Sequence, residues 1–211
     1  MKKITLEELE KGCRKYEENE GRASFYGLAV EIAEDYPLQA AIILLAVWNK
    51  MQFRYLTSGA ENLVELRDAI NECKPLFEKL GNKNFQDVDF DEIGEVVKEI
   101  YSKLSKTEGM KYTGASKVMH LFNRRLFVMW DDYIRGNKPK KYYPDLEIIK
   151  EGYWEFKSYE KSDAGSYLEF LKDMQKLFGH INFKNDNKTL AKAVDEYNYA
   201  NITLPIQELE P

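Results

Sequence analysis

Histidine and cysteine are scarce in this sequence of 211 residues, which holds two of each. The histidines, His120 and His180, and the cysteines, Cys13 and Cys73, do not have the spacing of metal ligands, so we expect no metal site. So few histidines also leave no basis for a Ser/His/Asp triad. Both cysteines continue apolar helix stripes without a pairing signature, which is typical of reduced thiols in a cytoplasmic protein.

Signals of several other protein classes are missing as well. The first residues, MKKITLEELEKG, are charged and amphipathic, unlike a signal peptide. The longest apolar run, Leu38 to Trp48 with Gln39 as its one interruption, is too short to cross a bilayer. No glycine-rich phosphate loop is present, so we expect no nucleotide cofactor and no other cofactor. The sequence predicts a soluble cytoplasmic protein and leaves its oligomeric state open.

Charge is distributed unevenly along the chain. The net charge of −5 at pH 7 argues by itself against binding to nucleic acid. Residues 103–141, however, contain ten Lys or Arg and three Asp or Glu, a net charge of +7, which leaves −12 for the rest. Two interpretations of this basic region stay open: a contact surface for phosphates, or a solvated face on an acidic protein.

Helical periodicity dominates the sequence, and strand signals are nearly absent, so the predicted fold class is all-α. Apolar residues three and four positions apart predict one helix after another. The second of these helices offers the core a stripe of Phe25, Leu28, Ile32 and Tyr36. Pro75 is expected to break or restart the fourth helix.

The helix predicted from Pro37 to about Leu56 is apolar on all sides between Ala40 and Val47, and we expect it to be the central packing element. Its second half mixes aromatic and amide side chains, among them Trp48, Gln52 and Phe53. Such residues suit a nucleobase pocket, because an aromatic face holds the ring and an amide reads its edge. They also suit the end of a core helix that meets solvent, and both interpretations stay open.

The stretch from Lys111 to Arg135 carries the most specific chemical signal. It reads as a short helix from Gly114 to Phe122, a basic break, an apolar run from Leu126 to Trp130, and two carboxylates that open another helix. A preceding amphipathic helix ends in a turn around Gly109. The order of helix, glycine-containing connection and helix is typical of a hairpin whose backbone amides meet a phosphate.

This stretch resembles the helix-hairpin-helix DNA glycosylases of the bifunctional glycosylase/lyase kind, and most closely the archaeal 8-oxoguanine DNA glycosylases. The matching residues are Ser116-Lys117 near a helix start, and Asp131 or Asp132 before Tyr133. An upstream segment, 53–59, is similar to the aromatic-Arg-Leu-Thr-Gly segment of those enzymes. The family's Leu-Pro-Gly-Val-Gly turn is absent, and the spacing of 14 positions from Lys117 to Asp131 is shorter than is usual for the family.

The resemblance implies a two-lobed helical bundle, with residues 37–136 as the central lobe and residues 1–36 plus 137–211 as the second. It also implies the removal of an oxidised purine from damaged duplex DNA, with or without cleavage of the strand. Lys117 would then be the nucleophile, provided that its surroundings keep part of it neutral. Asp131 or Asp132 would stabilise the cationic sugar, and Trp48, Gln52 and Phe53 would form the base pocket.

Helix periodicity places Lys117 at the edge of a buried stripe, partly sheltered from solvent. The residues expected to contact the DNA backbone are Lys111, Thr113, Gly114, Arg124, Arg125 and Lys138. Two alternatives remain: a non-catalytic DNA-binding protein of the same fold, and a helical protein-interaction domain.

Overall fold

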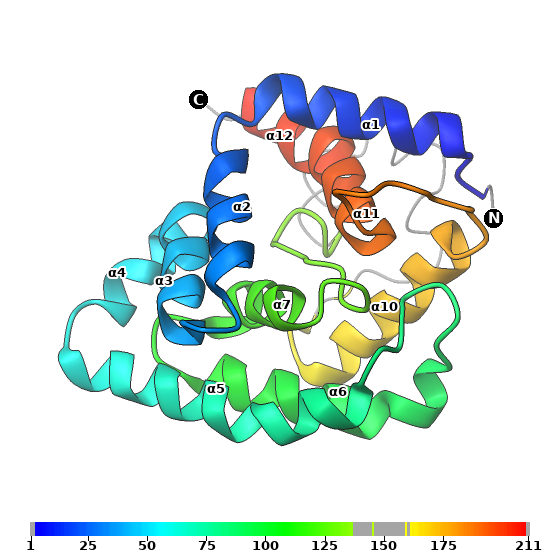
Figure 1. Cartoon of the computed structure of the whole chain (residues 1–211). Coiled ribbons are helices and arrows are strands. Elements are labelled where there is room, and N and C mark those ends of the chain that lie inside the picture. The colour runs from blue at the N-terminus through cyan, green and yellow to red at the C-terminus, as the bar shows by residue number, and fades with distance from the viewer. Residues whose placement is uncertain (1–2, 137–144, 146–158, 160, 210–211) are drawn as a thin grey trace.

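The structure is a computed structural model that describes residues 3–136, 145, 159 and 161–209 (Figure 1). Its elements are α1 (Leu6–Asn19), α2 (Ala23–Ile32), α3 (Pro37–Trp48), α4 (Lys50–Leu56), α5 (Ala60–Leu80), α6 (Phe90–Lys106), α7 (Lys111–Phe122), α10 (Ala164–Phe178), α11 (Leu190–Asn198), the π-helical turn η1 (Tyr199–Thr203) and α12 (Leu204–Leu209). No strand occurs in these residues, so the predicted all-α class is confirmed.

Helix α7 occupies the middle of the molecule, with α5 and α6 on one side and α1, α11 and α12 on the opposite side (Figure 1). Every residue from 114 to 121 is buried. Small residues at its start permit this close packing: a Cβ added to Gly114 would lie 2.9 Å from Asn49 Nδ2 and 3.1 Å from Leu45 Cδ2. The surrounded helix is therefore α7, and the prediction that the helix after Pro37 is the central element was wrong.

Three of the four residues in the apolar stripe predicted for the second helix face solvent, and Ile32 alone of the four packs partly against the core. Phe25, Leu28 and Tyr36 are 48%, 45% and 57% exposed, whereas Ala29 is fully buried. The methyl group of Ala29 allows close packing that the larger side chains would prevent, so periodicity identified the wrong face.

The helix predicted from Pro37 to Leu56 is interrupted at Asn49, which has non-helical torsion angles of φ −134° and ψ 32°. The buried Asn49 side chain donates from Nδ2 to Gly109 O at 3.3 Å and to Met110 O at 3.2 Å. It thereby joins the α3–α4 junction to the turn between α6 and α7. The break also ends the hydrogen-bond ladder of α3, which leaves carbonyl groups near its end for other donors.

Pro75 does not break its helix, because α5 runs without interruption from Ala60 to Leu80. Cys73, Leu76 and Leu80 are buried around the proline. Their burial stabilises the helix beyond the position where local preference would end it.

The connection between α6 and α7 depends on Gly109, which has a φ of +72°. A Cβ at this position would lie 2.2 Å from Leu56 N, so a larger residue is excluded by contact as well as by torsion angle. The turn glycine of the predicted hairpin is therefore Gly109, and Gly114 belongs to the helix that follows.

Both cysteines are buried and unpaired. Burial raises the pKa of Cys13 and that of Cys73 to about 12, so neither is a reactive thiolate near neutral pH. Among the residues that the structure describes, no helix is long and apolar enough to span a bilayer.

Candidate functional site

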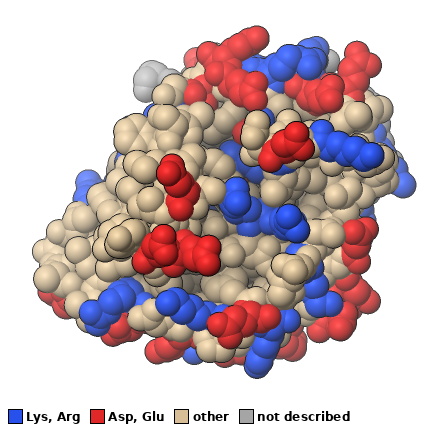
Figure 2. All heavy atoms as spheres, viewed as in Figure 1, with Lys and Arg blue, Asp and Glu red and all other residues tan. Residues whose placement is uncertain are grey.

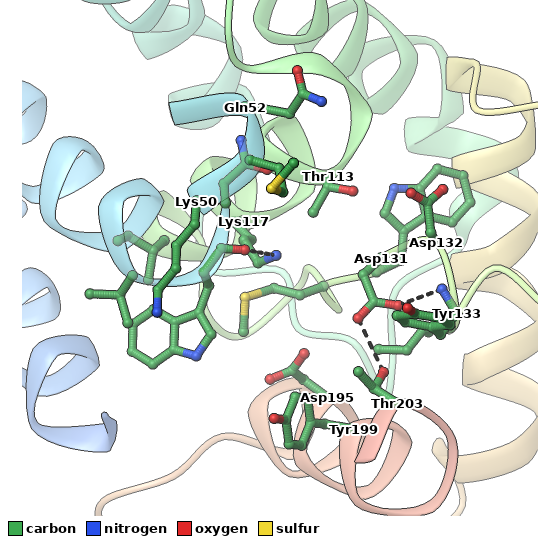
Figure 3. Close-up of a pocket in the computed structure, with 18 of the residues that line it drawn as sticks. Lys50, Gln52, Thr113, Lys117, Asp131, Asp132, Tyr133, Asp195, Tyr199 and Thr203 are labelled. Carbon is green, nitrogen blue, oxygen red and sulfur yellow. Dashed lines mark hydrogen bonds between the residues drawn. The ribbon is translucent and has the colours of Figure 1, made fainter. Parts of the chain in front are cut away.

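A cavity of about 320 Å³ opens where α7 meets the α3–α4 junction, the segment 129–134 and the region of α11 and η1. Tyr16 of α1 and Tyr26 of α2 also line it. Its lining includes seven of the predicted site residues: Lys117, Asp131, Asp132, Trp48, Gln52, Lys111 and Thr113. Figure 3 labels Lys117, Asp131, Asp132, Gln52 and Thr113 among them.

Lys117 projects from the middle of α7 and is 8% exposed, so it is more deeply buried than predicted. Its Nζ donates to Trp48 O at 2.7 Å, a carbonyl at the end of α3. Burial lowers the pKa of Lys117, and the nearby carboxylates of Asp131 and Asp195 offset part of this effect. A lowered pKa increases the neutral fraction of the amine, which is the form that attacks an electrophile.

The segment from Phe127 to Trp130 leads to Asp131 through the interior without regular structure. A buried carbonyl group without a hydrogen bond is costly, and here side chains supply the donors. The contacts are His120 Nδ1 with Phe127 O at 2.6 Å, Tyr167 OH with Val128 O at 2.9 Å and Ser116 Oγ with Trp130 O at 3.2 Å. These contacts fix the segment and hence the position of Asp131.

Asp131 is held in one orientation by three donors. Its Oδ1 accepts from Tyr133 N at 2.8 Å and Ile134 N at 2.7 Å, and its Oδ2 accepts from Thr203 Oγ1 at 3.1 Å. Burial raises the pKa of Asp131, although these hydrogen bonds and Lys117 favour the anion. The predicted capping contact is present, but residues 132–135 form a turn instead of a described helix.

Asp132 also lines the cavity, but its Oδ1 accepts two hydrogen bonds from neighbours. These come from Tyr112 OH at 2.7 Å and Arg135 Nη2 at 2.9 Å. The Arg135 guanidinium in turn lies 4.7 Å from the centre of the Tyr112 ring. Of the two predicted carboxylates, Asp132 therefore stabilises the turn, and Asp131 is the one held opposite Lys117.

Figure 3 shows the Lys117 amine and the Asp131 carboxylate on opposite sides of one space, with Asp195 on a third side. Lys117 donates to Trp48 O, and among the described residues it forms no ion pair with Asp131. A ligand placed between the two groups would contact both an amine and an anion.

Asp195 was not predicted from the sequence. Its Oδ2 accepts from the buried Lys192 Nζ at 2.8 Å, and that ammonium lies 4.7 Å and 4.9 Å from the ring centres of Tyr16 and Tyr26. Burial lowers the pKa of Lys192, but Asp195, Tyr16, Glu196 and Tyr26 together outweigh this effect, so the pKa is well above that of an ordinary lysine. No sequence signal marks this pair, because charges three residues apart are typical of a solvated helix face.

His120 is fully buried behind Tyr26, which lines the cavity. The carbonyl Phe127 O can only accept, so His120 Nδ1 donates, and its Nε2 accepts from Tyr26 OH at 2.7 Å. Burial lowers the pKa of His120 to about 4, so the ring is neutral near pH 7. The histidine is thus a structural link between α7, α2 and the buried segment.

The three residues predicted to form a base pocket are not equivalent. Trp48 and Gln52 line the cavity, whereas Phe53 packs against the hydrophobic core and is not part of the lining. Within the described part of the chain, the buried Gln52 Oε1 accepts no hydrogen bond. An amide whose oxygen has no partner can turn to meet a hydrogen-bonding group of a ligand.

The six residues predicted to contact a DNA backbone do not lie on one surface. Lys111 and Thr113 lie on the lining of the cavity, and Lys111 is exposed. Gly114 is buried and its amide donates to Met110 O, so it has no free donor for a phosphate. Arg124 and Arg125 line a separate groove, and Lys138 lies outside the described residues.

Across the described ranges, no group of three or more His, Cys, Asp or Glu side chains could hold a metal ion. Comparisons with family models, with curated proteins and with solved structures found no match to the chain. The geometry of the cavity is therefore the basis for any statement about function.

Proposed function

We propose that the chain is a DNA base-excision glycosylase with AP-lyase activity that removes an oxidised purine. The observation that carries the proposal is the desolvated amine of Lys117 opposite the fixed carboxylate of Asp131 across one cavity. The cavity volume of about 320 Å³ falls within the range of small-ligand sites.

The proposed reaction begins with a nucleotide turned out of the duplex into the cavity. Neutral Lys117 attacks C1′ of the sugar while the bond from C1′ to the base breaks. The base leaves with the electron pair and takes up a proton. The anionic Asp131 stabilises the positive charge that develops on the sugar.

The new bond from C1′ to Lys117 Nζ then becomes a Schiff base as the sugar ring opens. Loss of a proton from C2′ and of the 3′ phosphate from C3′ cleaves the strand by elimination. Water later hydrolyses the Schiff base and restores the amine. Lysine suits both steps, because a single amine acts as nucleophile and as electron sink.

The other residues of the cavity have roles in binding. The Trp48 ring and the Gln52 amide offer a stacking face and a hydrogen-bonding edge to a purine. At the rim, the exposed side chains of Lys50 and Lys111 are placed to meet phosphates. Exposed cations outside a buried reactive centre suit a polyanionic substrate.

The test is borohydride trapping with duplexes that carry an oxidised purine. We expect the wild-type chain to form a covalent adduct and Lys117→Gln to form none, a loss of at least about three orders of magnitude. Lys103→Gln is the control, because Lys103 lies on the exposed side of α6 and pairs with Glu72. The proposal fails if wild-type protein neither forms an adduct nor releases a base from any such duplex.

A non-catalytic DNA-binding protein of the same fold makes a different prediction for the same experiment. It would bind the duplex with an affinity that falls as salt rises, yet it would release no base. The lowered pKa of Lys117 favours the catalytic interpretation, because a residue that only binds phosphate has no need of a neutral amine.

A further inference from the structure

A second groove, of about 590 Å³, lies at the C-terminal end of α7. It is lined by Phe77, the loop 81–86, residues 122–125 and the segment 183–190, and it shares no residue with the cavity of Lys117. Figure 2 shows basic side chains in a hollow near the middle of one face of the molecule, with acidic side chains around it. The groove is therefore a second candidate binding site, separate from the cavity.

Arg124 and Arg125 are exposed on this groove, and their guanidinium groups form no ion pair or hydrogen bond with the described residues. Arg22, Arg67 and Arg135 each pair with a carboxylate, whereas Arg14 and Arg54, like Arg124 and Arg125, form no ion pair with the described residues. An acidic chain offers many carboxylates, so two adjacent guanidiniums without one are available to an anion from outside.

The backbones of the two arginines are nevertheless fixed. Arg125 O accepts from Phe85 N at 2.8 Å, and Arg124 O accepts from Thr189 Oγ1 at 2.7 Å. The turn is thus tied to both loops that border the groove. Ordering the side chains on a ligand would not require the backbone to be ordered first, which lowers the cost of binding.

The start of α11 adds a second source of positive potential. Thr189 caps this nine-residue helix by accepting from Lys192 N at 3.2 Å, and Leu190, its first residue, lines the groove. The first amides of a helix have no intrahelical acceptor and favour a bound anion. Two free guanidiniums and a helix N-terminus therefore face the same groove.

The remaining charges of the groove do not cancel these groups. Lys188 is bound to Glu17 and Glu196, so it is not available. Asp186 is the acidic residue of the lining, against the two guanidiniums. Asn82, Asn123, Asn185 and Asn187 contribute amide groups that can donate to phosphate or sugar oxygens.

We infer that this groove binds the phosphate of a nucleotide unit. The half-buried ring of Phe183 lies in the lining and offers an aromatic face to the attached base. Phe77 and Phe122 also line the groove, but their rings pack against each other with centres 5.6 Å apart. The same chemistry is present in a free nucleotide and in a nucleotide of a single strand. The inference does not require Lys117 or the glycosylase reaction.

Calorimetric titration with inorganic phosphate, adenosine monophosphate and a single strand of about ten nucleotides tests the inference. We expect Arg124→Ala combined with Arg125→Ala to weaken binding of all three at least about tenfold. For the strand, it should also reduce the slope of log affinity against log salt by about one to two. Arg14→Ala is the matched control, because Arg14 is exposed on α1 outside the groove.

A second variant, Asn187→Asp, places a negative charge in the groove at an exposed position and should weaken binding without removing an arginine. Lys117→Gln should bind all three probes as wild type does, which separates this inference from the proposed function. Tighter binding of the strand than of the nucleotide identifies a strand as the source, and equal affinity identifies the free nucleotide. The inference is overturned if wild type binds none of the probes, or if both groove variants bind them unchanged.

Discussion

The cavity and the groove both lie along α7, but their charged side chains differ in burial and in the contacts that hold them. In the cavity, Lys117 and Asp131 are sheltered from solvent, and each is held by hydrogen bonds to its polar atoms. In the groove, Arg124 and Arg125 are exposed and are held through their backbones alone. Burial alters the pKa of a group and hence its reactivity, whereas exposure preserves a charge for electrostatic binding.

A short chain of hydrogen bonds lies between the cavity and the groove. Tyr26 lines the cavity and donates to His120, which donates to Phe127 O. Arg124 on the groove side is close enough to act electrostatically on both Tyr26 and His120. The neutral His120 therefore lies between the cavity, which is suited to chemistry, and the groove, which is suited to binding.

After the loss of trapping expected for Lys117→Gln, the next largest effect should come from the Asp131 carboxylate. Asp131→Asn should slow base release by about a hundredfold or more, because the neutral amide cannot stabilise the cationic sugar. Asp132→Asn should change the rate by less than about threefold, since Asp132 binds Arg135 and Tyr112. Single-turnover rates with saturating enzyme measure both variants, and equal losses would contradict the assignment of Asp131.

The buried His120 between the two regions should make the free energy of unfolding depend on pH in the acid range. The pKa of His120 is about 4 in the folded chain and about 6.5 in the unfolded chain. Between these two pH values the unfolded state binds a proton at His120, and the folded state does not. Stability should thus fall by about 3 kcal/mol as pH falls from about 6.5 to about 4. Urea denaturation at several pH values measures this loss.

His120→Gln is the control for that measurement. It should lower stability near pH 7, because the pair of contacts to Tyr26 and Phe127 is altered, but it should remove most of the dependence on pH in this window. An unchanged pH dependence in the variant would show that other groups account for the loss.

The pH dependence of the trapping rate should show how burial changes the protonation of Lys117 and Asp131 in the cavity. Lys117 becomes neutral at a pH below the value of about 10.4 that is ordinary for lysine, and Asp131 becomes anionic at a pH above its ordinary value of about 3.9. Both requirements make the trapping rate rise with pH. A half-maximal rate near pH 10.4 would argue against a desolvated nucleophile.

The smallest expected effect comes from the groove. Arg124→Ala combined with Arg125→Ala should change trapping of a saturating damaged duplex by less than about twofold, since these residues share no lining with the cavity. A large loss of trapping in a folded variant would show that the two regions act as one DNA-binding surface.

Much of the helical content could be predicted from local patterns. The amphipathic helix around Ile93 and Ile100, the cap at Asp89 and the buried run from Leu126 to Trp130 all follow from the spacing of apolar and capping residues. The break at Asn49 and the continuous helix through Pro75 could not be predicted, because contacts distant in sequence decide both.

The candidate site was predictable in part. A resemblance suggested Lys117 and Asp131, and the structure brings both to one cavity with Trp48 and Gln52. Asp195 is absent from that prediction, because its partner Lys192 makes it resemble a surface ion pair. The sequence also predicted Lys111 and Arg124 as contacts to one DNA backbone, although Lys111 lines the cavity and Arg124 lines the separate groove.

The irregular segment from Phe127 to Trp130 has a consequence for tolerance to insertions and deletions. The carbonyl groups of Phe127, Val128 and Trp130 each meet a donor whose position is set by a helix: His120 and Ser116 on α7, and Tyr167 on α10. Removing one residue would shift the following chain by about 3.3 Å and mismatch these donors. Chain length at this point should therefore be less variable than residue identity, and a single-residue deletion there should abolish both folding and the alignment of Asp131.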